Sequence, residues 1–279
     1  MTKESLDISG KLDKNSIHVI EAIWEEAQNL SIPFLIVGAA ARDMLMHHYY
    51  GVEIERATTD VDFAVEVADW DSYQSLATNL VNRGFKKTNQ NQRLKADNHM
   101  LIDIVPFGAI ADANGDIQWP PDKDMEMNIL GFEEALNAPV HLKIRDKPEL
   151  IAPVVSVAGF LLLKLIAWGD RTADKRPKDA VDIKYIIQKY ASIDHSYDLV
   201  WDQPDLIERY EGDMECVAAQ LLGRLVGELA NTDSSKAIAK VFSTKLLDTF
   251  CTEMSQRGAQ EFDKNYELMD AFVEGFNQS

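Results

Sequence analysis

The sequence predicts an α/β (α+β) fold, in which a mixed sheet with flanking helices is followed by a mainly helical C-terminal region. In the first half, short apolar runs typical of buried strands alternate with amphipathic helical segments. From about Val154 onward, the segments are helical almost throughout. No internal repeat or low-complexity segment interrupts this order. We therefore expect two domains, residues 1–150 and 151–279.

The N-terminal part predicts a helix, a strand and a second helix. Residues 16–30 carry apolar side chains at helical spacing, and Ser16 is the expected N-cap. Residues 34–37 (FLIV) indicate a short buried strand. Gly38 then provides a sharp turn into a helix that stops at Gly51.

Acidic residues stand inside the next two predicted strands. In TTDVDFAV (58–65), Asp60 and Asp62 alternate with apolar residues. Residues two apart in a strand face the same way, so these carboxylates project side by side. Such a pair is costly unless a cation lies between its members. After a further helix and a hairpin-like region, LIDIVPFG (101–108) predicts another apolar strand with a single acid, Asp103.

The remaining segments complete the expected order. Residues 115–144 hold a Pro-Pro pair, short strands and a turn. Residues 154–171 and 178–191 predict helices, and further helices follow Asp213, Ser234 and, approximately, Gln260.

Composition excludes several classes of protein. A net charge of −18 does not suit a general nucleic-acid coat, because phosphate binding depends on Lys and Arg. No apolar run reaches the roughly 18 residues of a membrane span, and the polar N-terminus lacks a secretory signal. Cys216 and Cys251 lie far apart and have no partner pattern, so we expect free buried thiols. A cytoplasmic protein with no membrane partner is expected.

Two clusters of basic residues interrupt the acidic sequence. Both are candidates for a local basic patch. Solvated surface is the expected interpretation of the first cluster and a weaker interpretation of the second. The first contains Arg83, Lys86, Lys87, Arg93 and Lys95, and the second contains Lys164, Arg171, Lys175, Arg176 and Lys178.

Three features converge on one predicted site. Gly38 follows a buried strand and opens a helix, where backbone N–H groups and the positive helix end suit a phosphate. If the strands of Asp62 and Asp103 are neighbours, Asp60 joins them in a group of three carboxylates near that helix. Such a group predicts a site for Mg²⁺ and a nucleoside triphosphate. Taken alone, Asp103 could also be a salt-bridged core acid.

The segments VGAAARD, RATTDVDFAV and LIDIVPFG together resemble the polymerase-beta-type nucleotidyltransferase superfamily. That superfamily pairs a Gly-Gly or Gly-Ser turn with Asp-x-Asp and a third carboxylate on a later strand. The closer resemblance is to AbiEii/AbiGii-type toxin nucleotidyltransferases, because KLIAWGDRTADKRPKDAVDI is similar to their helical Lys…Arg…Lys-Asp…Asp motif. It covers roughly residues 33–190. It implies a nucleotidyltransferase-like catalytic domain and a helical domain that completes the nucleotide cleft.

The resemblance also implies residue roles. Asp60, Asp62 and Asp103 would be catalytic ligands of Mg²⁺ or Mn²⁺, and Asp103 would also be the candidate base. Gly38 and Ala39 would hold the triphosphate, and catalytic Lys164 would neutralise its charge. The other implied nucleotide-binding residues are Arg42, Thr59, Arg171, Lys178, Asp179 and Asp182. Ala39 replaces the usual second Gly or Ser, so a hydroxyl contact to phosphate is lost and turnover is in question.

Simpler interpretations of several residues stay open. Lys164 could extend from an apolar helix to solvent, and Asp179 and Asp182 could join Lys178 and nearby arginines in a surface network. Arg42 could pair with its neighbour Asp43. Arg56 could be structural or could reach a phosphate.

We therefore expect a metal-dependent enzyme that transfers NMP from an NTP to an acceptor hydroxyl. The resemblance favours RNA, such as a tRNA 3′ end, as acceptor, and suggests a toxin with a cognate antitoxin. A small-molecule or protein acceptor stays open because the chain is acidic. One alternative is a glycosyltransferase that holds Mn²⁺ and a nucleotide-sugar through Asp-x-Asp, and another is an inactive nucleotide-binding module. The glycine turn and third aspartate argue against the first, and the intact aspartate set argues against the second.

Overall fold

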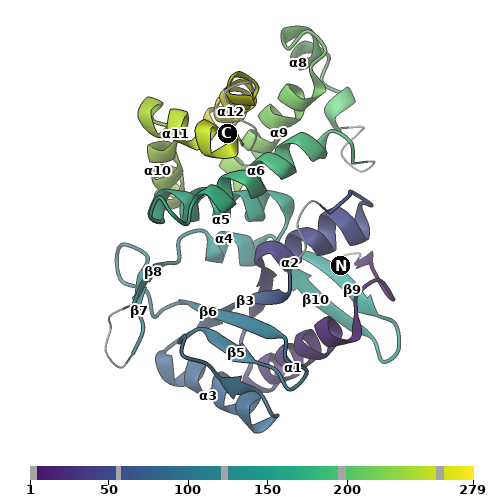
Figure 1. The fold of residues 1–279 in the computed structure, drawn as a ribbon, viewed down its shortest axis with the longest axis vertical. Helices are drawn as coiled ribbons and strands as arrows, with labels where there is room; N and C mark the ends of the chain where they lie inside the picture. Colours follow the sequence, from purple (N-terminus) through teal and green to yellow (C-terminus); the bar gives the residue numbers. More distant parts are fainter. Residues whose placement is uncertain (1–4, 55–57, 121–124, 194–198, 256–260) are drawn as a thin grey trace. The chain divides into compact units, whose positions relative to one another are not determined.

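The computed structural model describes residues 5–54, 58–120, 125–193, 199–255 and 261–279 (Figure 1). It confirms the predicted α/β class, with a large mixed sheet and many helices. The chain divides into two compact units, residues 1–156 and 157–279. Arg56 and Pro121 lie outside the described residues. Among the described helices, none combines the length and apolar character that a membrane span needs.

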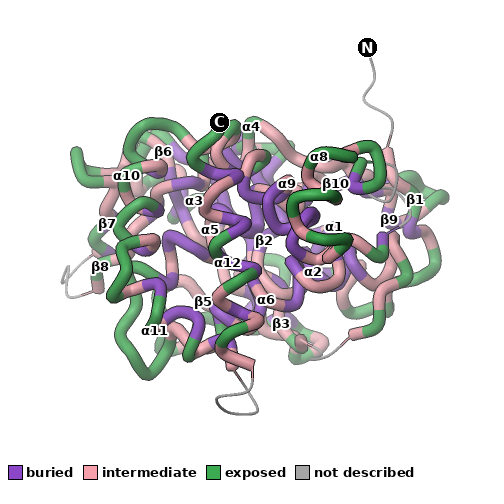
Figure 2. Tube along the Cα trace, turned by 90° about the horizontal axis from the view of Figure 1, so that it is seen from above, coloured by how far each residue is buried: buried purple, intermediate pink, exposed green. Residues whose placement is uncertain are grey.

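The first unit is built on an eight-stranded sheet of order β1-β9-β10-β2-β3-β6-β5-β4. A separate two-stranded ribbon pairs β7 with β8. The strands are β1 (Leu6–Asp7), β2 (Phe34–Val37), β3 (Asp60–Val67), β4 (Lys86–Lys87), β5 (Arg93–Lys95), β6 (Leu101–Gly108), β7 (Asp116–Gln118), β8 (Glu126–Asn128), β9 (Val140–Arg145) and β10 (Leu150–Val154). Figure 2 shows the burial that this order produces, with β2 buried along its whole length.

The register of the central strands aligns one row of residues across the sheet. β2 runs antiparallel to β3 with Val37 opposite Asp62. β3 runs parallel to β6 with Asp62 opposite Asp103. β5 runs antiparallel to β6 and places Arg93 opposite Asp103. The strands of the two acidic motifs are therefore neighbours, which is the condition that the predicted site required.

The helices of the first unit link the strands. They are α1 (Lys14–Leu30), α2 (Gly38–Asp43), the π-helix η1 (Met44–Tyr49), α3 (Trp70–Asn82) and α4 (Phe132–Asn137). The predicted cap of α1 was wrong. Asp13 is the N-cap, and its carboxylate accepts from the N–H groups of Asn15 and Ser16, while the Ser16 hydroxyl also donates to Asp13. A carboxylate placed before the first turn competes successfully with the serine three residues later.

Helices α1 and α3 pack against each other (Figure 1). Buried Glu26 on α1 accepts from Arg83 at 2.5 Å and from Asn79 at 2.9 Å. Arg83 is exposed, as expected, and its guanidinium also pairs with this buried carboxylate. Lys86 and Lys87 from the same cluster are exposed as expected.

The second unit is helical among its described residues. Its helices are α5 (Val157–Asp170), α6 (Pro177–Tyr190), α8 (Pro204–Arg209), α9 (Met214–Leu229), α10 (Thr232–Val241), α11 (Thr244–Met254) and α12 (Phe262–Asn277). α9 and α12 approach closely, because a Cβ added at Gly223 would lie 1.9 Å from the Phe272 carbonyl oxygen. Trp168 and Phe250 fill the core, with ring centroids 4.9 Å apart.

Both cysteines lie in this core as free, buried thiols, as predicted. Burial raises the pKa of Cys216 to about 11 and that of Cys251 to about 12. Because the thiolate is the reactive form, we expect a disulfide reagent at pH 8 to label the folded chain at least about a hundredfold more slowly than free cysteine. Both thiols should react once guanidinium unfolds the chain. Labelling of the folded protein at the free-cysteine rate would contradict this burial.

Candidate functional site

Three carboxylates of the first unit gather on the central strands. Asp60 and Asp62 lie on β3 and Asp103 lies on β6, and each of the three residues is half-buried. One carboxylate oxygen from each lies within 4.8 Å of the others. The alternation along β3 produces this arrangement, because Val61 and Phe63 point into the core while the two acids face away from it. We call Asp60, Asp62 and Asp103 the acidic triad.

The donor set fits a hard divalent cation. Mg²⁺ and Mn²⁺ prefer carboxylate oxygens, which are the only ligand atoms that the triad offers. Metal–oxygen distances of about 2.0–2.6 Å place the ligands of one ion roughly 4–5 Å apart at most. The spacing of the triad therefore suits an ion held by a few carboxylates.

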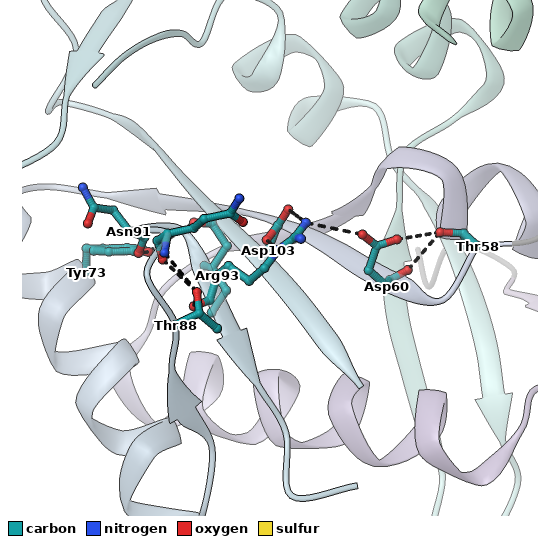
Figure 3. Close-up of polar contacts among 9 residues, drawn as sticks. Thr58, Asp60, Tyr73, Thr88, Asn91, Arg93 and Asp103 are labelled. Atoms are coloured by element: carbon teal, nitrogen blue, oxygen red, sulfur yellow. Dashed lines mark hydrogen bonds and ion pairs between the residues drawn. The ribbon is translucent and has the colours of Figure 1, made fainter. Parts of the chain in front are cut away.

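Arg93 contacts the triad (Figure 3), so its expected place among solvated surface residues is wrong. Its Nε donates to Asp103 Oδ1 and its Nη2 to Asp103 Oδ2, both at 2.6 Å. Nη2 also lies 3.4 Å from Asp60 Oδ2. The hydrogen bond to Asp103 is the largest cause that raises the pKa of Arg93. Asp103 therefore forms a salt bridge, which is the alternative that the sequence left open for this residue.

Thr58 holds the other end of the triad. Its hydroxyl donates to Asp60 Oδ1 at 2.6 Å. Asp60 thus accepts from Thr58 on one oxygen and from Arg93 on the other, which fixes its orientation (Figure 3).

Gly38 lies directly against Asp62 at the start of α2. Its φ of +70° is in the left-handed region. A Cβ at this position would lie 1.9 Å from Asp62 Oδ2. Glycine is therefore required here both by the backbone conformation and by the close approach of a carboxylate.

Gly38→Ala should destabilise the chain more than the matched variant Gly51→Ala. Gly51 has a similar φ of +75°, but nothing lies within 4 Å of an added Cβ. A left-handed alanine costs roughly 1–2 kcal/mol at either position, and only Gly38→Ala also displaces a carboxylate. Urea denaturation of both variants measures the difference. Equal losses would mean that Asp62 moves aside without cost.

The other predicted residues of the first unit occupy three kinds of position. Ala39 is half-buried in the first turn of α2, where no side chain caps the helix. Arg42 is buried and pairs with Asp43 at 2.7 Å, as the simpler interpretation predicted. Thr59 is exposed immediately before β3. Nucleotide contacts for these residues stay a prediction.

The predicted residues of the second unit form a cluster of their own. Lys164 Nζ on α5 donates to Asp179 Oδ1 at 2.9 Å and to Asp182 Oδ2 at 2.7 Å. Arg171 Nη1 donates to Asp179 Oδ2 at 2.6 Å. The two aspartate side chains are 1% and 4% exposed, so they do not form a surface network. Lys164 does not extend to solvent, because its ammonium contacts both of these carboxylates. Lys178 is exposed and has no ion pair among the described residues.

A second ionic contact holds the segment between α5 and α6. Arg176 Nε donates to Glu253 Oε1 at 2.8 Å, and Trp168 Nε1 donates to Glu253 Oε2 at 2.7 Å. The Arg176 guanidinium also lies 4.7 Å from the centre of a Trp168 ring. Arg176 therefore has a structural role, whereas Lys175 from the same basic cluster is exposed.

Comparisons with solved structures find distant likenesses, among them the following three. The antibiotic-resistance factor ANT(2'')-Ia is 12% identical with a TM-score of 0.33, and the match covers 67% of this chain and 98% of that chain. An antigenic nucleotidyltransferase-like protein from Paracoccidioides brasiliensis is 17% identical with a TM-score of 0.39, over 72% of this chain and 94% of that chain. The Thermotoga maritima CCA-adding enzyme complexed with tRNA is 11% identical with a TM-score of 0.26, over 96% and 82%.

Sequence comparison gives the family. No curated protein sequence matches the chain. The sequence model described as nucleotidyl transferase AbiEii toxin, type IV TA system, matches residues 27–215, which is more than half of the chain. The residues matched include the acidic triad and Gly38. They also include the ionic cluster of the second unit, which consists of Lys164, Arg171, Asp179 and Asp182. The chain therefore belongs to the AbiEii family of nucleotidyltransferase toxins.

Proposed function

We propose that this nucleotidyltransferase transfers NMP from an NTP to an acceptor hydroxyl at the acidic triad, with Mg²⁺ or Mn²⁺ held by Asp60, Asp62 and Asp103. The observation that carries the proposal is the position of Asp62, which pairs with Asp103 across the sheet and whose carboxylate lies against Gly38. The carboxylate oxygens of the triad therefore lie next to the first turn of helix α2. A nucleotidyl transfer needs both, because the reacting phosphate must be held and its charge neutralised.

The chain's own residues have defined tasks in this reaction. Backbone N–H groups of Gly38 and Ala39 donate to phosphate oxygens of the NTP. A carboxylate oxygen of Asp103 accepts the proton of the acceptor hydroxyl. The acceptor oxygen bonds to the α-phosphorus as the bond to the β-phosphate oxygen breaks, and pyrophosphate leaves. A bound divalent ion would supply charge neutralisation at the phosphates and activation of the attacking oxygen.

The predicted nucleotide contacts of the second unit belong to this proposal. Lys164, Arg171, Lys178, Asp179 and Asp182 are assigned to nucleotide binding by resemblance. Within their own unit, all but Lys178 already form a compact ionic cluster. Exposed Lys178 is therefore the member whose replacement tests nucleotide binding without disturbing that cluster.

RNA, such as a tRNA 3′ end, is the acceptor that we propose, with a cognate antitoxin as the regulatory partner. The family description supports the antitoxin, because it names a toxin of a toxin–antitoxin system. The RNA acceptor is proposed from the resemblance of the sequence motifs. The net charge of −18 favours an acceptor bound at a local basic region over one bound along an extended surface. A small molecule or a protein is the competing acceptor. We place the reaction in the cytoplasm, consistent with two free, buried cysteines.

A transfer assay tests this function. Each of four α-³²P-labelled NTPs is incubated with the full chain, total cellular RNA and Mg²⁺ or Mn²⁺. We expect label from one or two NTPs in tRNA-sized RNA, and no label when the metal is chelated. Label in the protein itself would contradict the RNA acceptor. Transfer that survives chelation of the metal would contradict the metal requirement.

A further inference from the structure

We propose that Arg93 is the resident counter-ion of the acidic triad and competes with divalent cations for Asp103 and Asp60. The inference rests on the proposed function, because it concerns metal binding at the same carboxylates. It assigns to the chain a built-in group that restrains metal binding until the guanidinium leaves. The arginine would thereby set how strongly the enzyme holds metal without nucleotide.

The contacts of Arg93 have the geometry of a strong ion pair. Its two donors meet the two Asp103 oxygens in parallel at 2.6 Å each, which matches the planar fork of a guanidinium to a carboxylate. The side chains of Arg93 and Asp103 are only 25% and 17% exposed, so water screens the pair weakly. The 3.4 Å contact to Asp60 brings the same charge to a second member of the triad.

The antiparallel pair of strands β5 and β6 fixes the backbone position from which the Arg93 side chain reaches the triad. Pairing of β5 with β6 sets Arg93 opposite Asp103. The Ile104 N–H donates to the Gln92 carbonyl at 2.8 Å, and the Thr88 hydroxyl donates to the Arg93 carbonyl at 3.0 Å. The arginine is therefore delivered to the acids by the sheet register, which distinguishes it from a mobile surface side chain.

Two roles for this arginine predict opposite effects on metal affinity. A counter-ion lowers the affinity, because the guanidinium neutralises Asp103 and takes a lone pair on each of its oxygens. A structural brace raises the affinity, because its loss would let the carboxylates separate. Metal binding in the absence of nucleotide therefore distinguishes competition from bracing.

The test measures Mn²⁺ binding to the nucleotide-free full chain by calorimetry. Arg93→Gln should bind Mn²⁺ at least about tenfold more tightly than the wild type, as loss of a charge-assisted hydrogen bond predicts. The matched control is Lys95→Gln, which removes the same charge two residues along β5. Lys95 is exposed and lies opposite Leu101, so its replacement should change the affinity by less than about twofold.

Two further variants make every outcome informative. Arg93→Lys keeps a charge but cannot hold both Asp103 oxygens in parallel, so its affinity should lie between those of the wild type and Arg93→Gln. Asp62→Asn in the Arg93→Gln background should abolish binding. Unchanged or weaker binding in Arg93→Gln, or in Arg93→Lys if the glutamine variant fails to fold, overturns the inference alone. No saturable Mn²⁺ binding in any variant, with or without NTP, overturns the proposed metal site as well.

Discussion

Asp62→Asn should lower nucleotidyl transfer at least about a thousandfold while the chain stays folded. A metal ligand supplies roughly 4 kcal/mol of transition-state stabilisation, and each 1.36 kcal/mol corresponds to a tenfold change in rate. Asp62 lies opposite Asp103 in the sheet, and its carboxylate lies against Gly38 at the start of α2. Its replacement by the nearly isosteric asparagine removes charge without opening a cavity.

The stability of the same variant provides an independent check. Three clustered carboxylates repel one another, so loss of one charge should leave the melting temperature unchanged or raise it. Glu66→Gln is the matched control, because Glu66 is a half-buried acid on the same strand outside the triad. It should retain transfer within a few-fold of the wild type. Full activity of Asp62→Asn would show that the triad does not carry the reaction.

Lys164→Met should destabilise the chain by about 3 kcal/mol. The substitution leaves two almost fully buried carboxylates without the ammonium that both contact. Removing one member of a buried ion pair typically costs about 3–5 kcal/mol. The lower end applies because Arg171 still pairs with Asp179. Urea denaturation followed by circular dichroism measures the loss.

Two comparisons identify the cause of that loss. Lys178→Met changes an exposed lysine next to Asp179 and should cost less than about 0.5 kcal/mol. Asp182→Asn added to Lys164→Met removes one of the two buried carboxylate charges that the ammonium no longer contacts, and should recover part of the stability. If Lys164→Met and Lys178→Met lose equal stability, the buried cluster does not stabilise the second unit.

The triad could be predicted because strand periodicity alone determines which way Asp60 and Asp62 point. Asp103 joined them through one further inference, that two apolar strands are neighbours. Arg93 could not be predicted in the same way. Its place depends on the register of β5 against β6, and a hairpin shifted by one residue would direct its side chain to the opposite face.

The helical residues illustrate a different limit. Lys164, Asp179 and Asp182 were identified from a motif, but the burial of the aspartates depends on how α5 packs against α6. Helical periodicity predicts which face of a helix is buried, but it does not predict which other helix packs against that face. At the start of α1, both Asp13 and Ser16 are residue types that commonly cap the N-terminus of a helix, and the structure uses Asp13. Local propensity alone could not choose between the two.

The parallel pairing of β3 with β6 also determines when during synthesis the site can exist. Its three carboxylates come from positions 60, 62 and 103, and the arginine that pairs with two of them comes from position 93. Contacts between such distant residues form late, since the intervening chain must first be ordered. A nascent chain that has not yet exposed β6 carries two aspartates and no triad. Under the proposed function, the growing polypeptide is therefore catalytically silent until β6 has been synthesised and paired with β3.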